Sequence, residues 1–278
     1  MPLPKVAAIQ DISGVGRCSL TVAIPILSAM GVQVLPLPTA VLSNQTAFES
    51  YASTSLTGQL ACSINEWKKQ RLVFDAVTTG FLMNVKQASL VGEFLDYARS
   101  RGAMIVVDPV MGDGGSLYPI YKSDMCKAFI ALVRRADVIT PNLTEACLLA
   151  GIKYPEDAYP DHGFVWDIAE QLSSMGPHTV VVTGVNGQNG QICNIAYLAR
   201  QNKRLCVTNR RIGGSYSGTG DILSAVICGS LLRGDGVESA LRLAGELFEK
   251  AISLSLEEGT DPREGIALER FLHILIKA

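Results

Sequence analysis

The sequence predicts an α/β fold of three layers (α/β/α), in which helices cover both faces of a central, mainly parallel β-sheet. Short, β-branched apolar segments alternate with helical segments along most of the chain, and this alternation is typical of a parallel sheet covered on both faces. Hydrophobic residues make up 48% of the 278 residues and charged residues 18%, which is enough apolar material for a large core. No linker rich in proline, glycine or serine divides the chain, so we expect a single domain over residues 1–278.

Each predicted strand is short, mostly apolar and bounded by polar or glycine residues, as buried parallel strands are. These segments are 5–9, 32–35, 76–79, 104–107, 137–139 and 179–182. Candidate helices lie between them at 19–30, 57–70, 84–101, 123–134, 144–150 and 165–175. Segments 191–198 and 203–209 predict a hairpin, and three further helices are expected at 222–233, 237–256 and 268–276.

Composition excludes several classes of protein. The formal net charge is −2 and the basic residues are spread along the chain, so we expect no nucleic-acid partner and no anionic membrane surface. No apolar run reaches about 18 residues and no secretory leader is visible, so we expect no membrane span and a cytoplasmic location. The seven cysteines include no Cys-x-x-Cys pair, and most are expected to be small buried hydrophobes. The three histidines stand in no metal-ligand spacing, so we expect no zinc site.

The glycine-rich segment 213–221 leads directly into the apolar helical run 222–232. Free N–H groups in the first turn of a helix bind anions, and glycines let the backbone come close to them. We therefore expect Gly218, Thr219 and Gly220 to form an anion site and Asp221 to act as a general base beside it. The alternative is that Thr219 or Asp221 simply caps an ordinary helix.

Polar residues also follow the predicted strands, and ligands of open α/β sheets bind beyond the carboxyl ends of the strands. Four acids would face one crevice there, namely Asp108, Asp113, Glu145 and Asp221. Carboxylates packed so closely repel one another, and Mg²⁺ bridging nucleotide phosphates would relieve that repulsion. Taken singly, each of these acids could instead be a cap or a turn residue.

Two nucleotide-binding motifs are incomplete. Gly14-x-Gly16 half-matches the dinucleotide fingerprint, but Ser19 stands at the third glycine and no acid ends the second strand. This disfavours an NAD(P) dehydrogenase. No Gly-Lys pair exists, so a P-loop is excluded and ATP would have to bind in another way.

Three motifs carry a resemblance to a known family: Asp108-Pro109-Val110-Met111-Gly112-Asp113, Thr140-Pro141-Asn142-x-x-Glu145-Ala146 and Gly218-Thr219-Gly220-Asp221. In this order and at these separations they resemble the pyridoxal kinases, vitamin B6 kinases of the ribokinase superfamily. Further matches lie at 7–10, 43–46 and 174–177, so the resemblance spans most of residues 5–235. It implies a ribokinase-like fold, a homodimer, and use of ATP and Mg²⁺, with a monovalent cation left open.

Carried over by position, the resemblance makes Asp221 the base that deprotonates the 5′-hydroxyl of the vitamin, with Gly218, Thr219 and Gly220 as the anion hole. It implies that metal and water are organised by Asp108, Asp113, Glu145 and Thr140, and that the nucleotide is approached by Asn142, Thr183, Gly184 and Tyr216 together with Gly218 and Gly220. The vitamin ring would contact Asp11, Gln45, Thr46 and Phe81.

Two positions depart from the family pattern, because relatives often carry Ser at position 11 and His at position 45. The preferred B6 vitamer is therefore left open. The alternatives are a hydroxymethylpyrimidine kinase of the same fold and a catalytically silent B6-binding protein.

Overall fold

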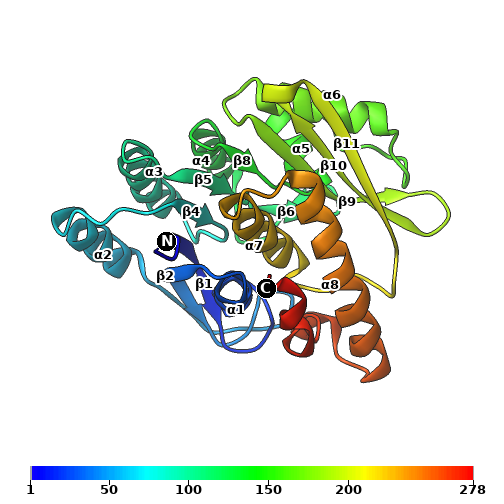
Figure 1. Ribbon diagram of the computed structural model, residues 1–278, viewed down its shortest axis with the longest axis horizontal. Helices are drawn as coiled ribbons and strands as arrows, with labels where there is room; N and C mark the ends of the chain where they lie inside the picture. The colour runs from blue at the N-terminus through cyan, green and yellow to red at the C-terminus, as the bar shows by residue number, and fades with distance from the viewer. Residues whose placement is uncertain (1, 278) are drawn as a thin grey trace.

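The computed structural model describes residues 2–277 and confirms the three-layer α/β/α fold (Figure 1). The strands of its main sheet are β1 (Lys5–Ser13), β2 (Gln33–Leu42), β3 (Ser53–Ser55), β4 (Ala76–Thr79), β5 (Met104–Val107), β8 (Val138–Ile139), β9 (Thr179–Gly187), β10 (Gln191–Leu198) and β11 (Lys203–Arg210). They form a nine-stranded sheet in the order β11-β10-β9-β8-β5-β4-β1-β2-β3. The strands from β2 to β9 in this order pair in parallel, whereas β3, β10 and β11 each join by an antiparallel pairing.

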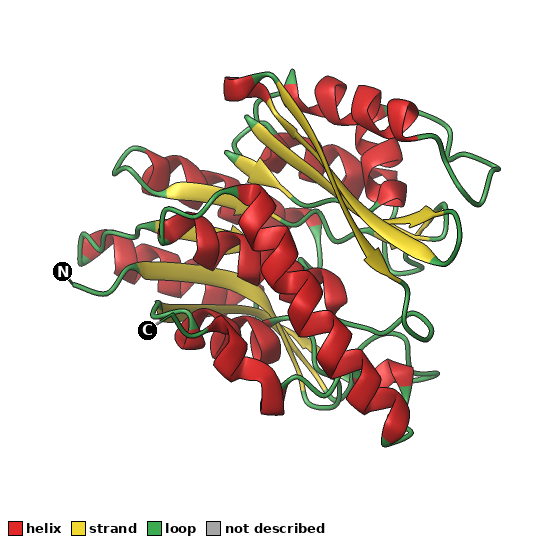
Figure 2. Ribbon diagram, turned by 45° about the vertical axis from the view of Figure 1, so that its right-hand side comes forward, coloured by secondary structure: helices red, strands yellow, loops and turns green. Residues whose placement is uncertain are grey.

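Two apolar cores lie on opposite faces of the sheet, each under its own layer of helices. One face is covered by α2 (Thr57–Lys69), α3 (Val85–Arg99), α4 (Ser123–Val133), α5 (Leu143–Ala150) and α6 (His162–Ser173). The other is covered by α1 (Leu20–Ala29), α7 (Thr219–Leu232), α8 (Val237–Glu257) and the 3₁₀ segment η3 (Glu269–Leu275). Figure 2 shows the strands between these helices, with α8 running across the front. Residues 2–277 contain no helix with both the length and the apolarity that crossing a bilayer requires.

The strand order places a topological switch point between β1 and β4. From β1 the chain moves through α1 to β2 on one side, and it later returns to place β4 on the other side of β1. The connections on the two sides run over opposite faces, which leaves a crevice beyond the carboxyl ends of β1 and β4. Asp11, near the end of β1, and Asp108, directly after β5, both reach this edge.

The predicted strand at 32–35 is too short. Observed β2 continues to Leu42 through Pro36 and Pro38. β1 pairs with β2 on one side over this stretch, while β3 pairs only with Ala40–Leu42 on the other side. The prolines are tolerated because a missing N–H is harmless on an unpaired side of a strand.

Three other predictions need correction. The helix expected at 268–276 is the 3₁₀ segment η3, and β9 runs on to Gly187, five residues beyond its predicted end. The short strand β3 and the two-stranded sheet of β6 (Gly112–Asp113) and β7 (Ser116–Leu117) were not expected at all. Two-residue strands carry no periodic pattern that a sequence could reveal. The remaining 3₁₀ turns are η1 (Ala199–Gln201) and η2 (Pro262–Glu264).

Candidate functional site

A cavity of about 1190 Å³ opens at the carboxyl edge of the sheet and runs between the two helical layers. Every residue that the sequence singled out for a site lines this one cavity: Asp11, Gln45, Thr46, Phe81, Asp108, Asp113, Thr140, Asn142, Glu145, Thr183, Gly184, Tyr216, Gly218, Thr219, Gly220 and Asp221. The fold therefore brings together residues from eight separate stretches of chain.

The turn before α7 is built so that only glycine fits at its corner. Gly218 is the N-cap residue and has φ +79°, in the left-handed region that favours glycine. A Cβ atom at this position would lie 2.0 Å from the carbonyl oxygen of Arg17. Thr219, Gly220 and Asp221 then form the first turn of α7, where backbone N–H groups have no partner within the helix. Such free N–H groups are able to bind a phosphate group.

A short chain of hydrogen bonds holds the Asp221 carboxylate in place. Its Oδ2 accepts from the backbone N–H of Ser19 at 2.9 Å, and the Ser19 hydroxyl donates to Oδ1 of Asp11. The other oxygen of Asp11 accepts from the Ser13 hydroxyl at 3.0 Å. Burial, with a smaller contribution from the charge of Asp11, raises the pKa of Asp221 to about 7 against the opposing hydrogen bond from the Ser19 N–H. A carboxylate with a pKa near neutrality suits a general base.

Buried acids crowd the centre of the cavity. Asp108 and Glu145 are each less than 5% exposed, and a Cβ atom on Gly220 would lie 4.0 Å from Oδ2 of Asp108. Burial, followed by the charges of Glu145 and Asp221, raises the pKa of Asp108 well above its usual range. Beside them the Thr140 hydroxyl is buried, makes no hydrogen bond of good geometry among the described residues, and lies close enough to Asp108 to offset part of the rise in its pKa. Carboxylates plus a free hydroxyl are oxygen donors of the kind that Mg²⁺ and its waters use.

Glu145 also has a structural role, namely the helix cap that the sequence left open as an alternative. Its Oε2 accepts from the backbone N–H of Asn142 at 2.9 Å, while Oδ1 of Asn142 accepts from the Glu145 N–H at 2.9 Å. This reciprocal pair is a capping box at the start of α5. The other carboxylate oxygen of Glu145, Oε1, accepts from the N–H of Met111 at 3.0 Å, across 34 residues of sequence. Burial nevertheless raises the pKa of Glu145 to about 8.

The side chain of Gln45 lines the same cavity, and its amide is already hydrogen-bonded within the protein. Its Nε2 donates to the Ser217 hydroxyl at 3.0 Å and to the Arg263 carbonyl at 2.9 Å, while Oε1 accepts from the Ala47 N–H at 2.9 Å. Both amide hydrogens are therefore committed. The predicted contact between Gln45 and a ligand ring stays a prediction, and these two hydrogens are not free to make it. Gln45 instead anchors the loop that carries the exposed, cavity-lining Thr46.

Two aromatic residues provide apolar walls. Phe81 is buried, and its ring lies 5.9 Å from that of Tyr121. Tyr216 is buried in the core beside α7, and its carbonyl accepts from the Thr219 hydroxyl at 3.1 Å. Phe81 and Tyr216 both line the cavity.

The ends of β8 and β9 form the remaining wall. Asn142 and Thr183 are joined by an isolated parallel bridge, and Nδ2 of Asn142 donates to the Gly112 carbonyl at 2.8 Å. Gly184 has φ +66°, and its N–H donates to Oδ1 of Asn194 at 3.1 Å. These contacts tie the flap of β6 and β7, which carries the exposed Asp113, to the sheet.

Ser19 and Arg211 are among the cavity residues that sequence reasoning missed. Ser19 has φ +49°, so the half-matched glycine motif had detected a real left-handed turn whose N–H serves Asp221 rather than a dinucleotide. Arg211 lines the cavity, and its Nη1 donates to Oδ1 of Asn186 at 2.5 Å. Its place two residues before the glycine-rich turn was a signal, because a cation near a phosphate site is expected.

Comparison with known proteins places this geometry in context. Residues 24–264 match a family described as "Phosphomethylpyrimidine kinase". A crystal structure provisionally named as a phosphomethylpyrimidine kinase of Bacteroides thetaiotaomicron, in an orthorhombic form with pyridoxal, has 40% identity and a TM-score of 0.94, covering 99% of this chain and 96% of that one. Pyridoxal kinase from Lactobacillus plantarum has 32% identity and a TM-score of 0.89, covering 99% and 97%. Pyridoxal kinase PdxY of Rubrobacter xylanophilus is 25% identical, covering 96% of this chain and 93% of its own.

We predict that Gly218→Ala destabilises the protein by at least about 1–3 kcal/mol, because the left-handed conformation is strained for alanine and its methyl group meets the Arg17 carbonyl. The matched control is Gly214→Ala, since Gly214 has open space around a Cβ position and is absent from the positive-φ glycines. Urea unfolding of both variants measures the difference. Equal stability of the two variants would contradict the proposed constraint.

A second prediction concerns pH. Glu145 has a pKa of about 8 in the folded protein against an ordinary 4.5. Between these values the native state holds more protons at this site than the unfolded state, so stability is lost as pH rises. Glu145→Gln cannot lose this contribution. We therefore expect the free energy of unfolding of the variant, relative to wild type, to rise between about pH 5 and pH 8 without Mg²⁺.

Urea unfolding of both proteins across that range, in the same metal-free buffers, is the measurement. The comparison cancels the opposite effect of His178, whose pKa is lowered by burial in both proteins. A constant difference across the range would mean that Glu145 is already ionised in the folded state.

Proposed function

This chain belongs to the phosphomethylpyrimidine kinase family, and from that premise we propose that it transfers the γ-phosphoryl group of ATP to the 5′-hydroxyl of a vitamin B6 pyridine. The observation that carries the proposal is the position of Asp221. It lies in the first turn of α7, directly behind the Gly218–Gly220 turn, and faces a cavity large enough for a nucleotide and a small ring together. The likeness to a structure solved with pyridoxal supports the choice of ring.

In this mechanism Asp221 accepts the proton of the substrate hydroxyl. The substrate oxygen forms a bond to the γ-phosphorus as the bond to the bridging oxygen of ADP breaks, with ADP as the leaving group. The free N–H groups at Gly218–Gly220 stabilise the charge on the transferred phosphoryl group. The Ser19 N–H keeps the Asp221 carboxylate oriented toward the cavity throughout, because it binds one oxygen and leaves the other free.

We propose that Asp108, Asp113, Glu145 and Thr140 hold Mg²⁺ and its waters beside the phosphates. The raised pKa of Asp108 and the unpartnered Thr140 hydroxyl fit this donor set. Mg²⁺ would supply positive charge that neutralises the phosphate oxygens and removes the repulsion among these acids. We place the nucleotide against Asn142, Thr183, Gly184 and Tyr216, and the vitamin ring against Asp11, Thr46 and Phe81.

The remaining parts of the proposal concern the whole molecule. We propose that residues 1–278 act as one kinase domain, because strands from β1 to β11 join one sheet and the later helix α8 packs into a core on one of its faces. We also propose a cytoplasmic homodimer, in keeping with the pyridoxal kinase resemblance.

The second candidate is phosphorylation of hydroxymethylpyrimidine, which the description of the matching family favours. A catalytically silent binding protein is less well supported, because a binder has no need of a carboxylate with a pKa of about 7 beside an anion site.

The test of the proposed reaction is ATP consumption measured side by side with pyridoxal, pyridoxine, pyridoxamine and hydroxymethylpyrimidine. We expect at least one B6 vitamer to have a higher kcat/KM than hydroxymethylpyrimidine. A higher value for hydroxymethylpyrimidine would assign the chain to the pyrimidine branch and leave the phosphoryl-transfer mechanism intact. No ATP consumption with any of the four compounds would contradict the kinase assignment.

Asp221→Asn should lower kcat by about 10²–10⁴-fold while ATP binding and folding stay nearly unchanged, because the amide cannot accept the proton. In wild type, kcat/KM should rise with pH through about 7, the pKa at which Asp221 becomes the active base. This rise should be absent in the variant. Retention of more than about a tenth of wild-type kcat, or a change confined to KM, would show that another group is the base.

Asp11→Ser should change the relative kcat/KM of pyridoxal, pyridoxine and pyridoxamine by more than about tenfold, which is roughly 1.4 kcal/mol. The physical reason is that a buried acceptor discriminates against ligands that leave it unpaired. ATP affinity should not change. An equal loss for all three vitamers would mean that Asp11 acts only by holding Ser19, and through it Asp221.

A further inference from the structure

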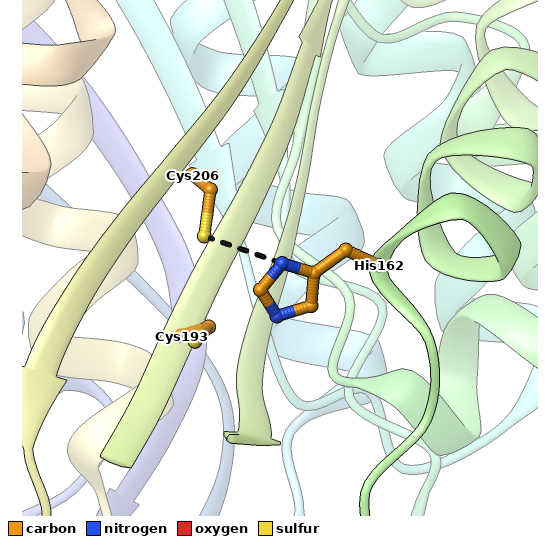
Figure 3. A group of neighbouring side chains, drawn as sticks. All are labelled: His162, Cys193 and Cys206. Atoms are coloured by element: carbon orange, nitrogen blue, oxygen red, sulfur yellow. Dashed lines mark hydrogen bonds between the residues drawn. The ribbon is translucent and has the colours of Figure 1, made fainter. Parts of the chain in front are cut away.

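Three potential metal ligands meet on the face of the sheet under α6, away from the acids of the candidate active site. They are His162 at the start of α6, Cys193 on β10 and Cys206 on β11 (Figure 3). One ligand atom from each lies within 4.8 Å of the others, and Nδ1 of His162 is 3.9 Å from Sγ of Cys206. The sequence analysis did not find this cluster, because it considered only the spacing of the histidines along the chain.

The separation between His162 and Cys206 is close to that of two ligands in a zinc site. Zn–S bonds of about 2.3 Å and Zn–N bonds of about 2.0–2.1 Å at tetrahedral angles place sulfur and nitrogen about 3.5–3.6 Å apart. The observed 3.9 Å between His162 and Cys206 is therefore a few tenths of an ångström longer than a metal would require. Small side-chain rotations can close such a gap.

The geometry suits a metal better than a disulfide. Across the β10–β11 pairing Cys193 lies opposite Thr208, whereas Cys206 lies opposite Ile195. The two cysteines are thus diagonal neighbours, and diagonal positions are about 7–8 Å apart. A disulfide normally spans a Cα separation of about 4.4–6.8 Å. Both cysteines are free thiols in the structure.

The surroundings hold the three ligands in position. The Thr208 hydroxyl lies 3.5 Å from Sγ of Cys193 and 3.6 Å from Sγ of Cys206, where it can hydrogen-bond to metal-bound sulfur. Arg204 of β11 forms ion pairs with Asp167 and Glu170 of α6, at 3.2 Å and 2.6 Å. These ion pairs therefore hold α6 and the β10–β11 hairpin together close to the cluster.

We propose that His162, Cys193 and Cys206 form a zinc-binding site. Two thiolates and one imidazole are a donor set that selects Zn²⁺ over Mg²⁺, because soft sulfur ligands bind hard cations poorly. His162 and Cys206 are only partly buried, so the metal can reach the cluster from solvent. Three protein ligands leave one tetrahedral position for water.

The position gives the site a link to the cavity. Ile192 and Asn194, on either side of Cys193, line the cavity wall, and so does Pro160, two residues before His162. Zinc would therefore join α6 to the hairpin directly behind this wall. Zinc binding at this cluster does not depend on which ring the enzyme phosphorylates.

The experiment uses the reduced, chelator-treated full chain in excess Mg²⁺, with Zn²⁺ binding measured by calorimetry and Co²⁺ binding by its thiolate charge-transfer absorption. We expect one Zn²⁺ per chain and a thiolate band with Co²⁺. Cys206→Ser and His162→Gln should each weaken Zn²⁺ binding by at least about tenfold, because losing a ligand costs no less than the roughly 10–100-fold that losing an outer-shell partner costs. Zn²⁺ should raise the melting temperature of wild type more than that of either variant.

Cys62→Ser is the matched control, because Cys62 is exposed and outside the cluster, and it should bind Zn²⁺ as wild type does. The cobalt band separates this site from metal bound by the cavity acids, which contain no sulfur. Wild-type binding without a thiolate band, or equal affinity in wild type and Cys206→Ser, would overturn the proposal. Because both substituted residues are partly exposed, these variants are expected to fold.

Discussion

The site depends on one close contact between segments that lie far apart along the chain, where the turn at Gly218 packs against the backbone of Arg17. A side chain at Gly218 would collide with the Arg17 carbonyl, and the Arg17 N–H donates to the Glu264 carbonyl at 2.8 Å. Ser19, two residues further on, then binds Asp221. The loop after β1 therefore sets the start of α7, and with it the position of the anion site and of the acid beside it. Neither segment could form the site alone.

The buried acids at this edge of the sheet cost stability, although they serve the proposed activity. Asp108, Glu145 and Asp221 all have raised pKa values, and burial is the first cause in each case. Hydrogen bonds from the Asn142, Met111 and Ser19 backbones offset only part of the cost of ionising these groups. The ionised forms of these acids are therefore costly when no ligand is bound. A cation bound together with phosphates would stabilise them. Such tension is common where a site is organised for its ligands.

The sequence predicted those parts whose causes are local. Strands 76–79 and 104–107 were found residue for residue, because a short apolar run between polar residues needs no distant partner to be recognised. All the candidate site residues proved to line one cavity, since parallel strands end at a common edge. The sequence did not reveal the contacts between residues that lie far apart along the chain. The bond from Met111 to Glu145 crosses 34 residues, and the cluster around His162 joins three elements that no spacing along the chain connects.

The prolines of β2 have a consequence for how copies of this protein can meet. Pro36 and Pro38 sit on a stretch of β2 that pairs with β1 but not with β3, near the border of the sheet. Neither residue has an N–H to donate, so an incoming strand would find gaps at alternate positions where a continuous ladder is needed. Fusion of two sheets along this border is therefore obstructed. Any stable pairing of two chains on this side must bury helix surfaces or loops, and the border is protected against the strand-by-strand stacking that leads to fibrils.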